Sequence, residues 1–309
     1  MRLIFLGTPA FAVPTLEAIV AAGHEVLAVV TQPDRPRGRG QVAAASPVKQ
    51  AAVALGLPVY QPERVRRPEA VEYLRGLPCD AMVVVGYGQI IPQSIIDMAP
   101  LGIINVHASL LPKYRGAGPI QWAIVNGETR TGVTTMRIDA GLDTGDMLLK
   151  AETEIDPEEN AMALGTRLAA MGAQLLVATL DGLAAGTIGA EKQNGAQATH
   201  ARLIKKEDGR IEWTQSALAI HNRIRGLQPW PGAQTTFRGQ PLHIWRSRVG
   251  EGSGEAGHIV SLKPLAVGTG SGTLELVEVQ QEGRKRLAAG DFANGQRLKE
   301  NEVLGEQSA

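Results

Sequence analysis

Residues 103–107 read Ile103-Ile104-Asn105-Val106-His107, an apolar run that ends in an amide and an imidazole. A buried strand of a parallel sheet looks like this where its carboxyl end opens into a polar site. In extended backbone, side chains two residues apart point to the same face, so we expect Asn105 and His107 to lie side by side. The stretch therefore predicts a sheet with a polar, reactive edge.

A glycine-rich turn later in the chain supplies two carboxylates, in the run Gly141-Leu142-Asp143-Thr144-Gly145-Asp146. The amide of Asn105 donates at every pH, which suits the stabilisation of a developing oxyanion. His107 can donate to the same oxygen or exchange a proton, and Asp143 can orient the imidazole or accept a proton. Each residue alone is better explained as a turn former or a hydrogen-bonded structural group. The set as a whole predicts acyl-transfer chemistry.

The first half of the chain alternates short apolar runs with helical patterns. Proline near the start and glycine past the end mark several of these helices. We expect strands at 3–6, 26–30, 58–60, 81–85 and 103–106, helices at 9–22, 47–55, 69–74 and 93–98, and a polar loop over 31–46. This alternation predicts a doubly wound α/β domain with a mostly parallel sheet covered on both faces.

The second half changes its pattern after a long amphipathic helix expected at 158–183, which follows two strands at 132–138 and 147–151. A helix at 216–226 then precedes short strands at 233–237, 242–245, 258–261, 265–268 and 273–279, separated by glycine turns. Such spacing is typical of a small β-barrel. We therefore predict a Rossmann-like catalytic domain over 1–188, a linker over 189–205 and an OB-like β-barrel domain over 206–309.

The composition limits the possible partners. With 31 basic and 31 acidic residues the net charge is zero, so any polyanion must be bound by local basic clusters. The single cysteine, Cys79, excludes an internal disulfide and a cysteine-based zinc cluster. No apolar run approaches about 18 residues, and the amino terminus lacks the pattern of a signal peptide. We expect a cytoplasmic protein with no metal and no membrane span.

The chain resembles the methionyl-tRNA formyltransferases, within the superfamily of enzymes that use 10-formyltetrahydrofolate. The Asn105, His107 and Asp143 set and the Ser-Leu-Leu-Pro run at 109–112 mark the superfamily. The loop Thr31-Gln32-Pro33-Asp34-Arg35-Pro36 and the second domain indicate the tRNA-directed branch. Further matching segments are 7–9, 38–40, 46–49, 116–121 and 228–231, so the resemblance runs from end to end.

The resemblance implies that a formyl group passes from 10-formyltetrahydrofolate, the co-substrate, to the α-amino group of methionine on initiator tRNA, for translation initiation. Asn105 and His107 would stabilise the oxyanion, and Asp143 would hold His107 in its useful protonation state and help to move protons. Folate would be bound by Ser109, Leu110, Leu111, Pro112, Gly86, Tyr87, Gly88, Gln89 and Ile90. The tRNA would be bound by Arg35, Arg37, Arg39, Arg202, Lys205 and Lys206. A monomer is also implied.

Two alternatives stay open, and the chain departs from the family pattern at two points. No lysine pair follows Gly40, and Arg202 stands where a lysine is usual. One alternative is another formyl-folate enzyme, acting on a sugar amine or a glycinamide nucleotide or hydrolysing the folate; a shorter single-domain chain would favour the nucleotide enzyme. The other is a non-catalytic RNA-binding protein built on an OB-like barrel, which few aromatic residues and zero net charge disfavour.

Overall fold

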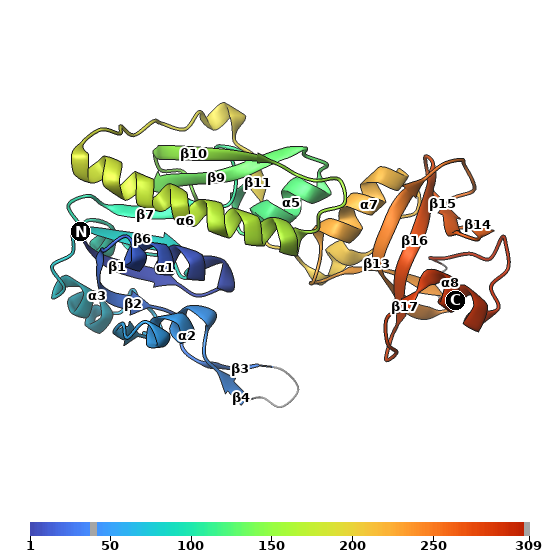
Figure 1. Cartoon of the computed structure of the whole chain (residues 1–309), viewed down its shortest axis with the longest axis horizontal. Coiled ribbons are helices and arrows are strands. Elements are labelled where there is room, and N and C mark those ends of the chain that lie inside the picture. The colour runs from blue at the N-terminus through green and yellow to red at the C-terminus, as the bar shows by residue number, and fades with distance from the viewer. Residues whose placement is uncertain (38–41, 306–309) are drawn as a thin grey trace. The chain divides into compact units, whose positions relative to one another are not determined.

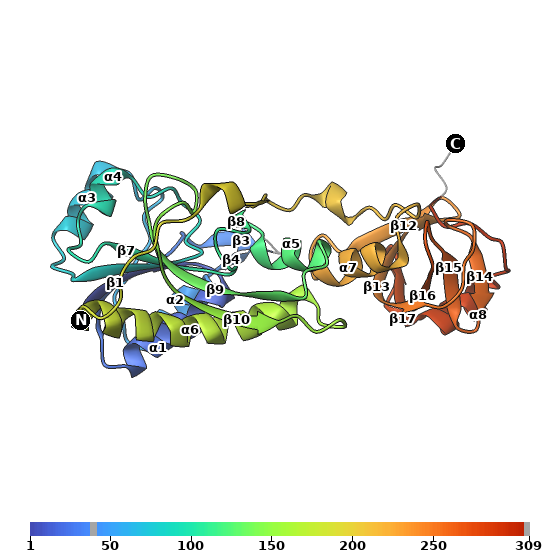
Figure 2. The same cartoon turned by 90° about the horizontal axis from the view of Figure 1, so that it is seen from above.

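The computed structural model describes residues 1–37 and 42–305. Contacts divide the chain into two compact units, each visible in Figures 1 and 2. Unit 1 comprises Met1–Gly116, Thr131–Thr153 and Gly165–His200, and unit 2 comprises Ala117–Arg130, Glu154–Leu164 and Ala201–Ala309. The chain thus passes repeatedly between the units. The predicted domain boundaries stay a prediction.

Unit 1 is built on a seven-stranded sheet in the order β10-β9-β7-β6-β1-β2-β5. Its strands are β1 (Arg2–Gly7), β2 (Glu25–Val30), β5 (Val59–Tyr60), β6 (Ala81–Val85), β7 (Ile103–His107), β9 (Arg130–Arg137) and β10 (Met147–Glu154). The five strands from β7 to β5 pair in parallel, and β9 runs antiparallel to β7. Strands β6 and β7 are buried throughout, as apolar runs between two helical layers must be.

Helices cover both faces of this sheet, and this arrangement confirms the predicted doubly wound α/β fold. They are α1 (Val13–Ala21), α2 (Pro47–Ala54), α3 (Pro68–Arg75), α4 (Gln93–Ile96) and α6 (Ala161–Ala185), with a 3₁₀ turn η1 (Ala10–Ala12) before α1. Figure 2 shows α1 and α6 on one side of the sheet and α3 and α4 on the other. Ser46 caps α2 by accepting a hydrogen bond from the Lys49 backbone N–H at 3.0 Å.

Helix α6 is long and apolar enough to cross a membrane by length and composition, the one such helix among residues 1–37 and 42–305. Its most apolar stretch has a mean hydropathy of 1.5, and 44% of that stretch is buried. Leu168, Leu176 and Leu180 are fully buried. The core helix of a globular domain passes the same test, so this is weak evidence for a span. The expected absence of a membrane span stays a prediction.

Several elements differ from expectation. The segment 31–46, predicted to be a loop, contains the antiparallel ribbon β3 (Arg35–Arg37) and β4 (Val42–Ala44), with Arg35 opposite Ala44. Backbone pairing forms this ribbon, and the polar sequence gives no sign of it. Two helices were not predicted, α5 (Pro119–Val125) and α8 (Ala289–Gln296). The remaining short elements are β8 (Arg115–Gly116), β11 (His200–Ala201), η2 (Gly195–Gln197) and η3 (Lys206–Gly209).

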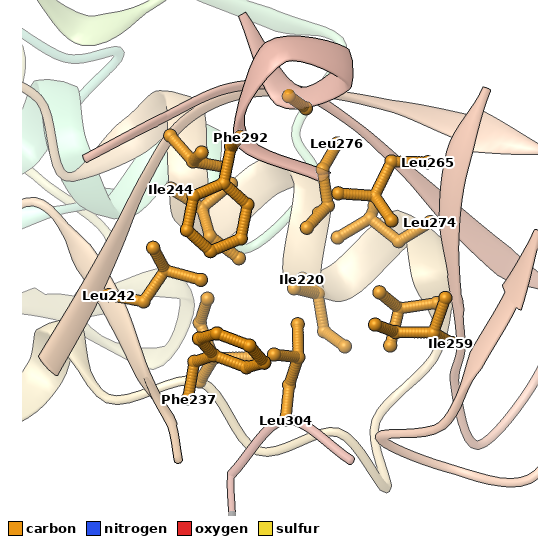
Figure 3. Close-up of a cluster of buried hydrophobic side chains, with 14 of the residues drawn as sticks. Ile220, Phe237, Leu242, Ile244, Ile259, Leu265, Leu274, Leu276, Phe292 and Leu304 are labelled. Atoms are coloured by element: carbon orange, nitrogen blue, oxygen red, sulfur yellow. The ribbon is translucent and has the colours of Figure 1, made fainter. Parts of the chain in front are cut away.

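Unit 2 contains an antiparallel, barrel-like sheet in the order β12-β13-β16-β15-β14, with β17 on β16. The strands are β12 (Ala233–Phe237), β13 (Gln240–Gly250), β14 (Ile259–Leu262), β15 (Leu265–Gly268), β16 (Thr273–Gln281) and β17 (Leu287–Ala288), and helix α7 (Ala217–Gly226) precedes them. Figure 3 shows Ile220 of α7 and Phe292 of α8 turned into the same apolar core. Leu304 bridges to Phe237 and Val303 bridges to His258, so the C-terminal segment joins the two sheet edges.

Candidate active site

The site lies where the carboxyl ends of β1, β6 and β7 coincide. Gly7 pairs with Val85, and Val84 pairs with Asn105, so the three strands end at one edge. The strand order reverses between β1 and β6, and open α/β sheets bind ligands at this point. The hydroxyl of Thr8, after β1, donates to the carbonyl of Tyr87, after β6, at 3.1 Å. This bond fixes the two connections that border the site.

Asn105 is the third residue of β7 and His107 is the last, and the two are 8% and 6% exposed. Two residues apart in a strand, they share one face. Within residues 1–37 and 42–305, the side-chain amide of Asn105 makes no hydrogen bond. Its amide atoms are not among the buried polar atoms that lack a partner in the described part of the chain, so the amide reaches the surface of the site. Asn105 therefore presents an unused donor at the strand end, as stabilisation of a developing negative charge requires.

The imidazole of His107 is oriented by a backbone carbonyl. Its Nε2 lies 2.9 Å from the carbonyl oxygen of Tyr114. Because a carbonyl oxygen only accepts, the hydrogen bond assigns the proton to Nε2. The other ring nitrogen, Nδ1, lies 3.7 Å from Oδ2 of Asp143. A proton gained at Nδ1 would therefore face a carboxylate.

Asp143 is held on a tight turn after β9. Its φ of 53° lies in the left-handed region. The backbone N–H of Gly116 donates to Oδ2 of Asp143 at 2.8 Å. A Cβ on Gly145 would collide with the carbonyl oxygen of Arg137, so glycine lets the turn pack on the end of β9. The structure thus brings together the three predicted catalytic residues; their roles stay predictions.

The predicted folate-binding run at 109–112 is largely built into the fold. Ser109 is fully buried, and its hydroxyl donates to the carbonyl of Lys113 at 2.6 Å. The hydroxyl of Thr134 on β9 donates to the carbonyl of Ser109 at 2.7 Å. Leu111 is buried in a small apolar cluster. Leu110 and Pro112 are half-buried and offer apolar surface.

The predicted folate-binding run at 86–90 also contains both residues that are built into the fold and residues that are exposed. The Tyr87 ring is buried in the apolar core of unit 1, and burial raises the pKa of its hydroxyl. Oε1 of Gln89 accepts from the backbone N–H of Val65 at 2.7 Å. Gly86 and Gly88 are exposed with φ of 58° and 82°, and Ile90 is 86% exposed. Backbone and Ile90 are thus the parts of this run open to a ligand.

The predicted tRNA-binding residues lie in two groups. In unit 1, the Arg35 side chain is 67% exposed and lies 3.7 Å from Glu63. The backbone of Arg37 ends β3, and Arg39 lies outside the described residues. In unit 2, Arg202 donates from Nη1 to Asp208 at 2.8 Å and stacks over Trp122. The hydrogen bonds to Asp208 raise the pKa of Arg202.

Two further members of the unit 2 group are lysines. Lys205 is exposed, and Lys206 borders a groove of about 940 Å³ together with Arg210 and Trp213. Arg210 also lies 3.3 Å from Glu212, so part of this basic cluster is already neutralised. The predicted contacts of Arg202, Lys205 and Lys206 with tRNA stay predictions.

Sequence reasoning missed residues that contact the site from the segment 191–199. Gln193 donates to the carbonyls of Asp143 and Gly145, and the hydroxyl of Thr199 accepts from the backbone N–H of Tyr114. Arg115, which is 9% exposed, donates to Gln193. The apolar residues of this segment show no helical or strand periodicity, and the sequence predicts a linker over 189–205. A polar segment without periodicity gives no local signal of such contacts.

Among residues 1–37 and 42–305, the structure holds no group of three His, Cys, Asp or Glu side chains arranged to bind a metal ion. The expectation that no metal is used stays a prediction.

Comparison with known proteins identifies both halves of the chain. The profile of the formyl transferase family matches residues 1–180, and that of the formyl transferase C-terminal domain matches residues 203–297. A crystal structure of an N-formyltransferase from Helicobacter canadensis, in complex with folinic acid and dTDP-3-aminofucose, shares the fold with a TM-score of 0.66. That alignment covers 91% of this chain and 99% of the other at 18% identity.

Two curated relatives match at much higher identity. A methionyl-tRNA formyltransferase from Solibacter usitatus is 77% identical, with 99% of each chain covered. A second, from Koribacter versatilis, is 56% identical over 100% of both chains. These matches confirm the resemblance drawn from the sequence. The chain belongs to the methionyl-tRNA formyltransferase family.

Proposed function

We propose that the protein transfers the formyl group of 10-formyltetrahydrofolate to the α-amino group of methionyl initiator tRNA, giving N-formylmethionyl-tRNA for translation initiation. The observation that supports this most is the 77% identity, from end to end, with a curated methionyl-tRNA formyltransferase. The free amide of Asn105, beside a histidine that faces a carboxylate, is the chemistry that such a transfer needs.

The amine of the acceptor attacks the formyl carbon of the folate donor, and the resulting tetrahedral intermediate collapses with cleavage of the bond to the folate nitrogen, so that tetrahydrofolate leaves. A deprotonated amine needs no covalent enzyme intermediate. In agreement, the hydroxyl of Ser109 is buried and already bonded to the carbonyl of Lys113, so Ser109 is not a nucleophile. Asn105 donates to the formyl oxygen as negative charge develops there. Each such donor is worth about 10²–10³ in rate.

His107 and Asp143 stabilise the negative charge on the formyl oxygen and accept the proton of the attacking amine. Nε2–H of His107 stays with the Tyr114 carbonyl, so Nδ1 is the position that exchanges a proton. Once protonated, Nδ1 donates to the formyl oxygen, and the nearby Asp143 carboxylate stabilises the imidazolium. Asp143 accepts from the Gly116 N–H and can take up the proton that the attacking amine releases, which then passes to the departing folate nitrogen.

The strand edge offers complementary surfaces for a pterin. We propose that the exposed backbone of Gly86 and Gly88 hydrogen-bonds its polar edge, while Ile90, Leu110 and Pro112 supply apolar contact. The other predicted folate-binding residues, Ser109, Leu111, Tyr87 and Gln89, act by holding these segments in place.

We propose that residues 1–188 form the catalytic domain, that residues 189–205 link the two domains, and that residues 206–309 assist the binding of tRNA. The phosphate contacts come from Arg35, Arg37, Arg39, Arg202, Lys205 and Lys206. Arg39→Ala should weaken tRNA binding and lower the slope of log affinity against log salt by about one, with folate affinity unchanged. The control is Arg66→Ala, which removes another exposed arginine of unit 1. A parallel loss of folate affinity would instead mean that the variant misfolds.

The decisive experiment mixes the purified protein with 10-formyltetrahydrofolate and charged initiator tRNA and detects N-formylmethionine by mass spectrometry. Uncharged tRNA, an amino sugar nucleotide and a glycinamide nucleotide serve as competing acceptors. We expect product only with the charged tRNA. Formyl transfer to another amine, without N-formylmethionine, would overturn the proposal.

We further propose that the protein acts in the cytoplasm as a monomer, without a metal and without a membrane. Light scattering of the purified protein measures its mass directly. A mass near twice the 32.8 kDa of the chain would contradict the monomer.

A further inference from the structure

The segment 191–199, which we name the clamp segment, contacts the candidate site at both of its ends. At its start, Glu191 and Met147 exchange two backbone hydrogen bonds of 2.8 Å, which dock the segment on β10. Gln193 and Thr199 then contact two different parts of the site. All of these residues belong to unit 1.

The amide of Gln193 is fully used. Its Nε2 donates to the carbonyl oxygen of Asp143 at 2.8 Å and to that of Gly145 at 2.7 Å. Its Oε1 accepts from Nε and Nη2 of Arg115 at 2.9 and 2.7 Å. Carbonyls only accept and a guanidinium only donates, so the amide fits in one orientation. Four hydrogen bonds thus fix one side chain between Arg115 and the Asp143 turn.

This bonding matters because Asp143 is in a backbone conformation that it does not favour. Its φ of 53° lies in the left-handed region, which residues other than glycine adopt less readily. Gly116 holds the carboxylate from one side, and Gln193 holds the carbonyl of the same residue from the other. Loss of Gln193 would remove both hydrogen bonds to the turn carbonyls and leave the carboxylate held by the Gly116 N–H.

Thr199 contacts the backbone of Tyr114, the residue whose carbonyl orients His107. Its hydroxyl accepts from the backbone N–H of Tyr114 at 2.8 Å, and its carbonyl accepts from that of Arg115 at 2.9 Å. Tyr114 has a φ of 61°, and its carbonyl is the acceptor that holds Nε2–H of His107. Thr199 therefore fixes the group that sets the tautomer of the histidine.

We propose that Gln193 and Thr199 are positioning residues for formyl transfer, which hold Asp143 and His107 at their working separation. The clamp segment is then part of the catalytic apparatus as well as a connection. This inference rests on the proposed function. A displacement of about 1 Å in a reacting group can cost about 100-fold in rate, so we expect losses of about 10- to 100-fold in kcat.

The first test uses Thr199→Val, which keeps the shape and removes the acceptor, and Thr199→Ser, which restores it. We expect Thr199→Val to lower kcat by about 10- to 100-fold, with little change in KM for folate, and Thr199→Ser to recover it. Nitrogen-15 NMR of histidine-labelled protein, with the His107 signal assigned through His107→Gln, should show the Nε2–H tautomer in wild type and Thr199→Ser. Thr199→Val should show a mixture of tautomers.

The second test uses Gln193→Glu, which keeps the acceptors for Arg115 and loses both donations to the turn. We expect a loss of kcat similar to that of Thr199→Val and a changed pH profile of kcat. Gln197→Ala is the matched control, because Gln197 is an exposed glutamine of the same segment. Thermal unfolding of Gln193→Ala, followed by circular dichroism, measures how much the side chain of Gln193 contributes to the stability of the fold.

Two results would overturn the inference. One is wild-type kcat and an unchanged pH profile in both Gln193→Glu and Thr199→Val. The other is a wild-type His107 tautomer in Thr199→Val together with a loss of activity that Thr199→Ser does not restore. An inactive wild-type protein would instead refute the proposed function. In that case the NMR comparison still tests whether Thr199 orients His107.

Discussion

Nδ1 of His107 lies 3.7 Å from Oδ2 of Asp143, although the two residues come from the end of β7 and from a turn beyond β9. In the antiparallel pairing of β7 with β9, His107 is opposite Thr134, whereas Arg137 at the end of β9 is opposite Ile104, so Asp143 reaches His107 through the turn and not through the end of β9. The pair is then held from outside, His107 by the Tyr114 carbonyl and Asp143 by the Gly116 N–H. The site thus depends on hydrogen bonds from the segment at 114–116 as much as on its own residues.

Asn105→Ala and His107→Ala should each lower turnover by about two to three orders of magnitude, because in the proposed mechanism each removes a donor to the formyl oxygen. Asn105→Asp should do no better, since a carboxylate cannot donate. Single-turnover formylation at saturating folate measures the effect. His200→Ala, an exposed histidine, is the control and should keep the wild-type rate. Near-normal rates in the Asn105 and His107 variants would refute the site.

Gly172→Ala should destabilise the fold by about 1 kcal/mol. A Cβ on Gly172 of α6 would lie 2.7 Å from Cγ1 of Val106, a short buried side chain between Asn105 and His107. Overpacking of this kind costs about 1–3 kcal/mol, and the better helix propensity of alanine returns up to about 1 kcal/mol.

The matched controls for this variant are Gly295→Ala and a compensating change. Gly295 of α8 has open space around its Cα, so alanine there should stabilise or have no effect. Val106→Ala should relieve the clash and partly rescue Gly172→Ala. All four tryptophans lie in unit 2, so the loss should appear in circular dichroism before tryptophan fluorescence changes. Equal stability of Gly172→Ala and wild type would contradict the close contact.

Tyr87→Phe should leave folate binding intact and raise the free energy of unfolding by up to about 1 kcal/mol. Within the described residues, the buried Tyr87 hydroxyl has no hydrogen-bond partner, and burying such a group is costly. Urea unfolding and a folate titration check the two effects. Weaker folate binding by Tyr87→Phe would mean that the hydroxyl contacts the ligand.

Asp208→Asn should remove a pH-dependent part of the stability of unit 2. The hydrogen bond from Arg202, with that from the Lys205 backbone N–H, holds the pKa of Asp208 below its usual value. Because the folded pKa lies below the unfolded value of about 3.9, the stabilisation is present above that pH and is lost as the pH falls through the folded pKa.

The urea midpoints of wild type and Asp208→Asn, followed by tryptophan fluorescence, should therefore differ at pH 7 and converge below about pH 4. Glu300→Gln is the control, since Glu300 is exposed and makes no side-chain hydrogen bond within residues 1–37 and 42–305. A difference that stays constant with pH would exclude the ion pair as its cause.

The fold of unit 1 could be predicted from the sequence because its signals are local. Strand β7 is an apolar run, and α2 has its cap at Ser46. The ribbon β3–β4 could not be predicted in this way, since pairing between Arg35 and Ala44 is a backbone contact that polar side chains do not report. Helix α5 is not predicted although Gly118-Pro119 marks its start, because a helix of only seven residues shows too little of the helical period.

The sequence by itself determined which groups can do the chemistry: an amide, an imidazole and a carboxylate, with glycines where the backbone must turn. Tertiary structure alone decided what orients them. The choice of Nε2 as the protonated nitrogen comes from the Tyr114 carbonyl, and the setting of the Asp143 turn comes from Gln193. Hydrogen bonds between segments far apart in the chain depend on sheet register and backbone direction, and residue type carries no record of either.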